Sequence, residues 1–130
     1  MHKRKPPVSK ALLGNVRYIR NACAHSNCLI ADINHKVEVN RAVSNVLAEC
    51  PWMSVSLRKK YARKQFTQDF TALLIAHKTL VKSEGMHDAA KNALRKLFFK
   101  RMTRHRDYFR RNDIISSTYK YCFELVRYYF

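Results

Sequence analysis

The chain has 130 residues and carries 26 Lys and Arg against 9 Asp and Glu, which gives a formal net charge of +17. This charge indicates a polyanionic partner, whereas a hydrophobic content of 47% excludes a disordered chain. Two glycines and three prolines are too few for a turn-rich β sandwich or barrel. The composition therefore predicts an all-α protein.

The chain begins with a basic stretch, residues 1–7, that ends in two prolines. It predicts a tail before a single helical domain over residues 8–130. No apolar run follows the tail, and no segment is apolar for long enough to span a bilayer. We therefore expect no secretory signal, no membrane partner and a cytoplasmic location.

Apolar residues recur at helical spacing in five stretches, which predicts a small bundle of about five helices. The first stretch runs from Ser9, its expected N-cap, to about His25. The other helices are expected over residues 42–50, 56–83, 86–102 and 113–126, with a basic turn over 103–112. Gly85 fits the C′ position that ends a helix, and Asn112 or Asp113 fits the N-cap of the last one.

Some residues in these apolar stripes are polar or reactive. The four cysteines are Cys23, Cys28, Cys50 and Cys122. In a chain without an export signal, they are expected to be reduced thiols packed as small apolar side chains. His77 lies in the stripe of 56–83 and is expected to be a packed, hydrogen-bonded core histidine. The apolar end Tyr128–Phe130 is expected to close the bundle or to contribute to a dimer interface.

A zinc site is the alternative role for some of these side chains. Cys23 and Cys28 lie near two histidines in the sequence, His25 and His35. Their spacing is not a recurrent zinc pattern, and Cys23 belongs to the apolar face of its helix. We therefore expect no metal and no other cofactor.

The segment from Arg20 to His25 holds the groups best suited to chemistry. Asn21 and His25 are four residues apart and share a helix face, Arg17 precedes Asn21 by four, and Arg20 lies one position round. An imidazole can take the proton from a ribose 2′-hydroxyl, and a guanidinium can stabilise the charge of the reacting phosphate. These groups predict RNA cleavage without a metal, leaving 2′,3′-cyclic phosphate ends. On spacing alone, a surface patch without a catalytic role is the more common outcome.

The residues Arg-Asn-Ala-Cys-Ala-His-Ser-Asn, from Arg20 to Asn27, resemble the Arg-x4-His signature of the HEPN superfamily. The match is closest to its Abi-like (abortive infection) branch, and residues 70–85 and 108–126 are similar to the C-terminal half of those proteins. The resemblance implies a HEPN-like helical fold and a metal-independent endoribonuclease of a phage-defence or toxin type. It also implies a homodimer, because two copies of the motif usually meet to form one composite site.

The resemblance also assigns roles to residues of the motif. His25 would be the general acid and base, Arg20 would stabilise the phosphate, and Asn21 would orient them. Asn27 matches a polar position after the histidine. The region before the motif is shorter than in Abi-like proteins, so two other hypotheses stay open. One is a non-catalytic HEPN-like module that binds RNA or an RNA-guided nuclease complex, as a phage-encoded anti-CRISPR-type inhibitor would. The other is a regulatory partner of a full-length Abi-like protein.

Two dense groups of cations predict a surface for RNA or a ribonucleoprotein. They lie around residues 58–64 and 95–111, with aromatic residues between the cations that can stack on unpaired bases. A basic membrane-surface helix is the weaker alternative, because the exposed faces lack the Trp and Leu ridge needed for insertion. The residues expected to contact RNA are Arg17, Asn27, Arg58, Lys59, Lys60, Arg63, Lys64, Arg95, Lys96, Lys100, Arg101, Arg104, Arg106, Arg110 and Arg111.

Overall fold

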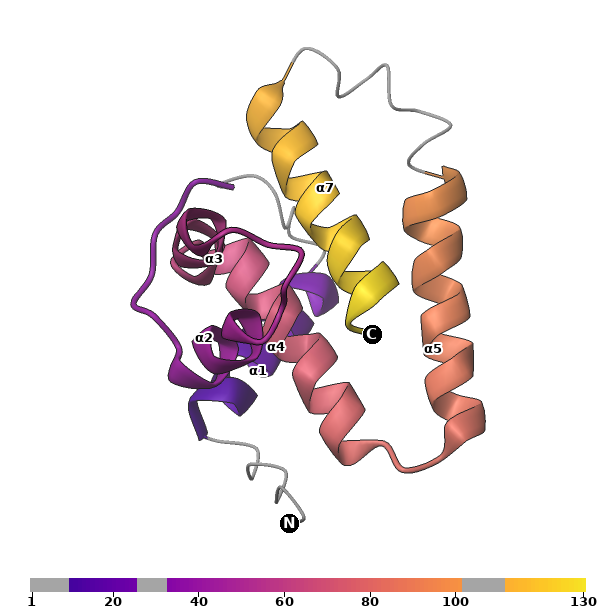
Figure 1. The fold of residues 1–130 in the computed structure, drawn as a ribbon. Helices are drawn as coiled ribbons and strands as arrows, with labels where there is room; N and C mark the ends of the chain where they lie inside the picture. The colour runs from indigo at the N-terminus through magenta and orange to yellow at the C-terminus, as the bar shows by residue number, and fades with distance from the viewer. Residues whose placement is uncertain (1–9, 26–32, 102–111) are drawn as a thin grey trace.

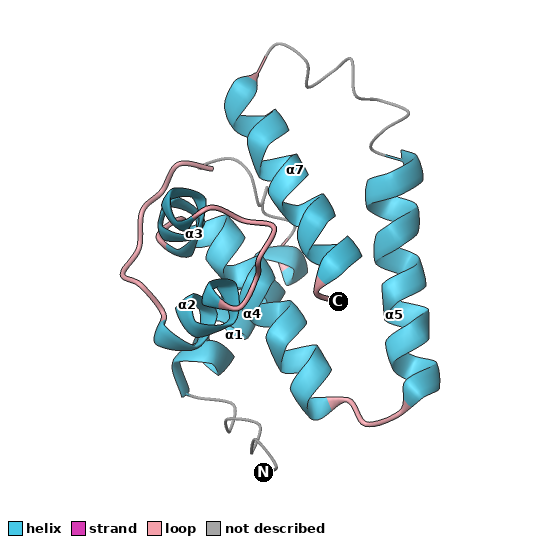
Figure 2. Cartoon of the chain, in the orientation of Figure 1, coloured by secondary structure: helices cyan, strands magenta, loops and turns pink. Residues whose placement is uncertain are grey.

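The computed structural model describes residues 10–25, 33–101 and 112–130, and the regular elements in these ranges are all helical (Figures 1 and 2). The all-α fold class is therefore confirmed. The elements are α1 (Lys10–Ala24), α2 (Arg41–Ala48), α3 (Val55–Ala62), α4 (Gln65–Leu80), α5 (Glu84–Lys96), the π-helical turn η1 (Leu97–Arg101) and α7 (Asp113–Tyr128).

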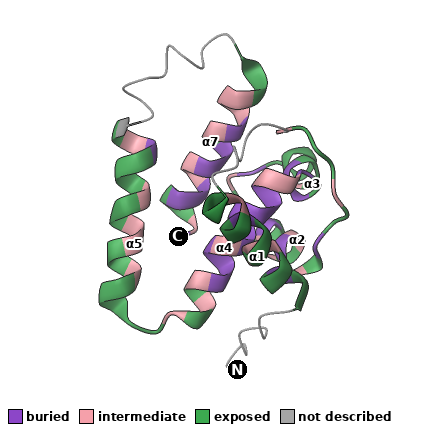
Figure 3. Ribbon diagram, turned by 180° about the vertical axis from the view of Figure 1, so that it is seen from behind, coloured by how far each residue is buried: buried purple, intermediate pink, exposed green. Residues whose placement is uncertain are grey.

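Helix α4 is the central element, and α1, α2, α3 and α7 all contact it. Most of its residues are buried, because apolar side chains surround it on more than one face. The core is built from fully buried leucines of four helices: Leu12, Leu47, Leu74 and Leu125. Helix α5 lies on the other side of α7 from α2 and α3, in both the front and the back view (Figures 1 and 3).

The periodic stretch 56–83 forms two helices rather than the single helix that its pattern predicts. The chain is extended at Lys64, with φ −98° and ψ 133°, and Lys64 forms an isolated antiparallel bridge with Lys36. The Val37 N–H donates to the Arg63 carbonyl at 2.7 Å. These bonds hold the chain in a conformation that a helix cannot adopt, so a segment distant in sequence separates α3 from α4.

The helix ends are set by polar caps, and one of them differs from the expectation. Gly85 lies in the first turn of α5 and does not end the preceding helix, because Ser83 caps α5 by accepting a hydrogen bond from the Met86 N–H. The predicted N-cap of α7 is confirmed, since the Asn112 side chain accepts from the first amides of that helix. The expected cap Ser9 lies outside the described residues.

The cysteines are only partly placed as expected. Cys50 and Cys122 are buried, and burial raises the pKa of both thiols. Cys23 is exposed, so its expected position in the core is wrong. Ile19 is the last buried residue of α1 and Ala22 is half-buried, whereas Cys23 and the two residues after it are exposed. Cys28 lies outside the described residues.

The C-terminal residues close the bundle around a pair of histidines. Phe130 is buried, and its ring centroid lies 5.3 Å from that of His77 and 4.7 Å from that of His87. His77 is therefore packed among aromatic rings, as expected. Its buried Nδ1 atom has no hydrogen-bond partner within the described ranges, so the expected hydrogen bond is not made at this atom.

Candidate nucleic-acid interface

A buried amide–carboxylate network fixes α1 on α4 and thereby sets which face of α1 is exposed. The Asn15 amide donates to Gln68 Oε1 and to Asp69 Oδ1, both at 2.7 Å, and its own oxygen accepts from the Asn40 amide at 2.6 Å. Gln65 donates to both Asp69 oxygens at 2.8–2.9 Å. This network was not predicted from the sequence, although Gln68 and Asp69 interrupt an otherwise apolar stripe.

The carboxylate at the centre of the network is almost completely enclosed. Asp69 is 2% exposed, and its hydrogen-bond partners are side-chain amides rather than cations. Burial raises the pKa of the Asp69 carboxyl above its ordinary value of 3.8, and the hydrogen bonds from Asn15 and Gln65 offset part of that rise. In this highly basic protein, Asp69 therefore has a structural role in holding two helices together.

The Arg20–His25 motif lies at the exposed C-terminal end of α1. The His25 N–H donates to the Asn21 carbonyl at 3.0 Å, so helical spacing continues to His25 and places both side chains on one face, as expected. Arg20, Asn21, His25 and Arg17 are all exposed, and Asn27 lies outside the described residues. Along a regular helix, Arg20 is about 140° round from His25, so the two side chains leave α1 in different directions.

Three cations of the first basic group form an exposed patch on one side of the bundle. We call Lys59, Lys60 and Arg63 the α3 patch, since they lie along α3 and at its C-cap. Arg58 is only half-exposed, because its Nη2 donates to the Cys50 carbonyl at 2.6 Å. Its guanidinium therefore ties α3 to the end of the α2 segment, and it lies at the edge of the patch.

Lys64, the last cation of this group, lies inside the protein. It is 8% exposed, and its ammonium donates to Asn34 Oδ1 at 3.1 Å. Burial lowers the pKa of Lys64, and the positive charges of Lys60 and Lys36 lower it further. Of the five cations in residues 58–64, only the three of the α3 patch are therefore fully exposed to a ligand.

The second basic group forms a separate patch at the end of α5. Arg95, Lys96 and Lys100 are exposed there and are called the α5 patch. The Arg95 guanidinium lies 5.7 Å from the centroid of the Phe99 ring. Because α3 and α5 lie on opposite sides of α7, the two patches lie on different parts of the described fold (Figure 1). The Arg101 backbone lies in η1, and four expected RNA contacts lie outside the described residues: Arg104, Arg106, Arg110 and Arg111.

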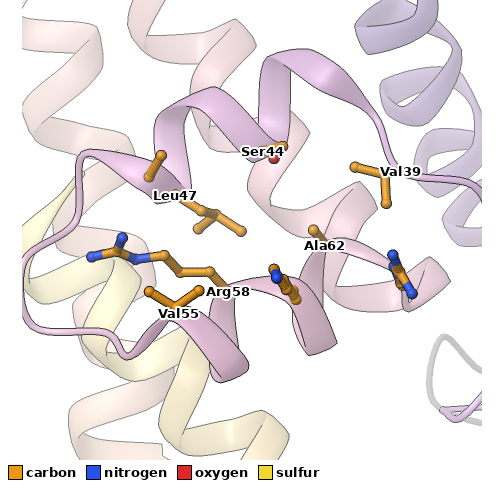
Figure 4. Close-up of a pocket in the computed structure, with 9 residues that line it drawn as sticks. Val39, Ser44, Leu47, Val55, Arg58 and Ala62 are labelled. Carbon is orange, nitrogen blue, oxygen red and sulfur yellow. The ribbon is translucent and has the colours of Figure 1, made fainter.

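A pocket of about 320 Å³ lies between α2 and α3, next to the α3 patch (Figure 4). Leu47 of α2 and Val55 and Ala62 of α3 line its walls. Val39 lies at one end, and the Arg58 guanidinium lies at the other (Figure 4). This pocket could not be predicted from the sequence, because its lining residues come from three separate segments and form no motif.

Comparison with protein-family models, curated proteins and solved structures finds no match to this chain. The resemblance to HEPN proteins therefore remains a prediction based on the motif. Within the described ranges, no group of three or more His, Cys, Asp or Glu side chains could hold a metal ion; Cys28 of the alternative zinc site is outside them. No helix in the same ranges has the length and apolar character needed to cross a membrane.

Proposed function

We propose that this chain is an RNA-binding protein that contacts phosphates through the α3 patch and the α5 patch. The observation that carries the proposal is uncompensated positive charge: residues 55–64 contain five cations and no Asp or Glu, and Lys59, Lys60 and Arg63 among them are exposed. Phosphates neutralise such a field and release counterions from the nucleic acid. The expectation that aromatic residues between the cations stack on bases is wrong for Tyr61, which is 4% exposed and packs in the core.

Charge reversal of each patch tests this proposal. We expect Lys59→Glu/Lys60→Glu/Arg63→Glu to weaken binding of a fluorescein-labelled single-stranded RNA equally for all sequences, because phosphate contacts carry no sequence information. The slope of log K against log salt should become shallower by about 0.7 for each phosphate that the variant no longer neutralises. Arg95→Glu/Lys96→Glu/Lys100→Glu tests the α5 patch in the same way.

A matched control separates a local contact from the effect of net charge. Replacing Lys10, Lys82 and Lys120 by Glu changes the net charge by the same amount at exposed positions outside both patches. This variant should lose much less affinity than either patch variant. Equal losses in all three variants, or a parent protein whose binding does not respond to salt, would contradict a specific phosphate-binding surface.

Metal-independent RNA cleavage at the Arg20–His25 motif is a second candidate function. It is favoured by the exposure of Arg20, Asn21 and His25, which leaves all three side chains accessible to a substrate. His25 would take the proton of a 2′-hydroxyl, whose oxygen attacks the phosphorus to form a 2′,3′-cyclic phosphate. The departing 5′-oxygen must receive a proton from a second imidazole, which a second copy of the motif would supply.

Cleavage assays with EDTA present test this second function. His25→Ala should lower the cleavage rate by about a hundredfold or more with RNA affinity preserved, because it removes a proton-transfer group. Arg20→Lys should also lose RNA cleavage, since an ammonium does not reproduce the bidentate contact of a guanidinium with a phosphate. His35→Ala, at another exposed histidine, is the control. RNA binding without cleavage by the parent protein would instead favour the non-catalytic HEPN-like module.

A further inference from the structure

The pocket between α2 and α3 combines an apolar lining with positive charge. Its walls are aliphatic, from Leu47, Val55 and Ala62 among others, and the Ser44 hydroxyl is its neutral hydrogen-bonding side chain (Figure 4). The other polar residues that line it are all cations, and none of the described lining residues is acidic. A ligand that fits must therefore have an apolar face joined closely to negative charge.

The size of the pocket limits the occupant further. A volume of about 320 Å³ lies near the lower end of the range of roughly 300–1,000 Å³ for ligand pockets. Inorganic phosphate would leave the aliphatic walls uncovered, and a base pair inside a duplex cannot enter. An unpaired nucleobase presents a flat face to the walls and carries its phosphates at the distance of one sugar.

We propose that this pocket receives one unstacked base of single-stranded RNA, whose flanking phosphates contact Lys59 and Arg63. The inference rests on the proposed function, because these two cations belong to the α3 patch and also line the pocket. The patch then positions the strand, and the pocket selects an unpaired nucleotide. Lys59 and Arg63 contact the phosphates, and the Arg58 Nη2 donates to the Cys50 carbonyl, so the Ser44 hydroxyl is left to contact the base edge. One hydroxyl cannot read a complete edge, so the site distinguishes a base from an abasic position rather than one base from another.

The first experiment compares three labelled ligands with the same number of phosphates: a short oligouridine, the same oligomer with abasic sites, and a duplex of half its length. The oligouridine should bind about tenfold more tightly than the abasic oligomer, the scale expected when a small apolar surface is buried. The duplex should bind with the salt dependence of phosphate contacts, and it should be insensitive to changes inside the pocket.

A pocket-filling variant supplies the second readout. Ala48 is an exposed lining residue at the end of α2, so Ala48→Phe places a ring at the pocket without removing any cation or opening the core. It should lower oligouridine affinity about tenfold and abolish the preference over the abasic oligomer. Ala89→Phe, at an exposed position of α5, is the matched control and should change neither.

The outcomes separate the inference from the proposed function. Equal, salt-sensitive binding of the oligouridine and the abasic oligomer, unaffected by Ala48→Phe, overturns the base pocket and leaves RNA binding intact. Failure of every oligomer to bind overturns both. In the parent protein, chemical-shift changes of the Val39, Leu47 and Val55 methyl signals on addition of oligouridine, absent with the abasic oligomer, are also expected. Their absence at saturation overturns the base pocket.

Discussion

Replacing Asn15 by alanine tests how firmly α1 is fixed on α4. The substitution removes the hydrogen bonds from Asn15 to Gln68 and to Asp69, and it leaves the Asn40 amide without its acceptor. A buried polar group that loses its partner costs about 1–3 kcal/mol. Because the three bonds share one side chain and the site can relax, we expect the free energy of unfolding to fall by roughly 2–4 kcal/mol.

Urea denaturation followed by circular dichroism measures this loss, and Asn45→Ala is the matched control. Asn45 is exposed on α2, so the same substitution there should change the free energy of unfolding by less than about 0.5 kcal/mol. The denaturant slope should be unchanged in both variants, because neither alters the surface exposed on unfolding.

The loss caused by Asn15→Ala should also depend on pH, through Asp69. The raised pKa of this carboxyl means that the folded protein binds its proton more tightly than the unfolded chain does. Protonation therefore stabilises the fold as the pH falls through the raised value toward 3.8. Without Asn15 the pKa of Asp69 rises further. The loss in free energy of unfolding caused by Asn15→Ala should therefore be largest at neutral pH and should become smaller in mild acid.

Two results would refute this reasoning about the network. One is a deficit below about 0.5 kcal/mol, which would mean that Asn15 contributes no more than an exposed amide. The other is a deficit that stays the same between neutral and mildly acidic pH, which would mean that the Asp69 carboxylate does not depend on the Asn15 amide for its charge.

Other substitutions test the core at single atoms. Thr71→Val removes the hydroxyl that bonds the buried Tyr121 hydroxyl and should cost about 1–3 kcal/mol, whereas adding Tyr121→Phe should restore most of the loss. Leu125→Ala, at a fully buried position, should lower the free energy of unfolding by about 2–5 kcal/mol in urea titrations. In the parent protein, the free energy of unfolding should increase as the pH rises through the lowered pKa of Lys64 toward 10.5, because the folded protein releases this proton before the unfolded chain does. Lys64→Met should abolish that increase.

Helical periodicity predicts most of the elements, because the core-facing residues of α1, α2 and α7 follow one face of a helix. It cannot predict the break at Lys64, since the bond from Val37 to Arg63 that imposes it comes from a segment more than twenty residues away. A local signal exists in Thr67, whose hydroxyl donates to the Tyr61 carbonyl across the break. A threonine in an apolar stripe does not by itself indicate such a bond.

The exposure of Asn21 could be predicted from spacing, because on a regular helix it lies on the opposite side of α1 from Leu12 and Ile19, the buried residues of that helix. The exposure of individual cations could not be predicted in this way. Arg58 and Lys64 have neighbours of the same charge in the sequence, yet tertiary contacts direct one to the Cys50 carbonyl and the other to Asn34. Whether a cation is available to a ligand depends on such acceptors, which composition does not reveal.

Helix α5 buries none of its side chains completely, and this weak anchoring has a consequence for its dynamics. It is attached through the half-buried Ala90 and Leu94, through the contact of His87 with Phe130, and through the following η1 segment, where the centroids of the Phe99 and Phe123 rings lie 4.3 Å apart. Segments with few buried contacts open at a lower free energy than the core. In hydrogen–deuterium exchange, amide protons of α5 should therefore be replaced before those of α4, and an RNA bound across the α5 patch should slow their replacement.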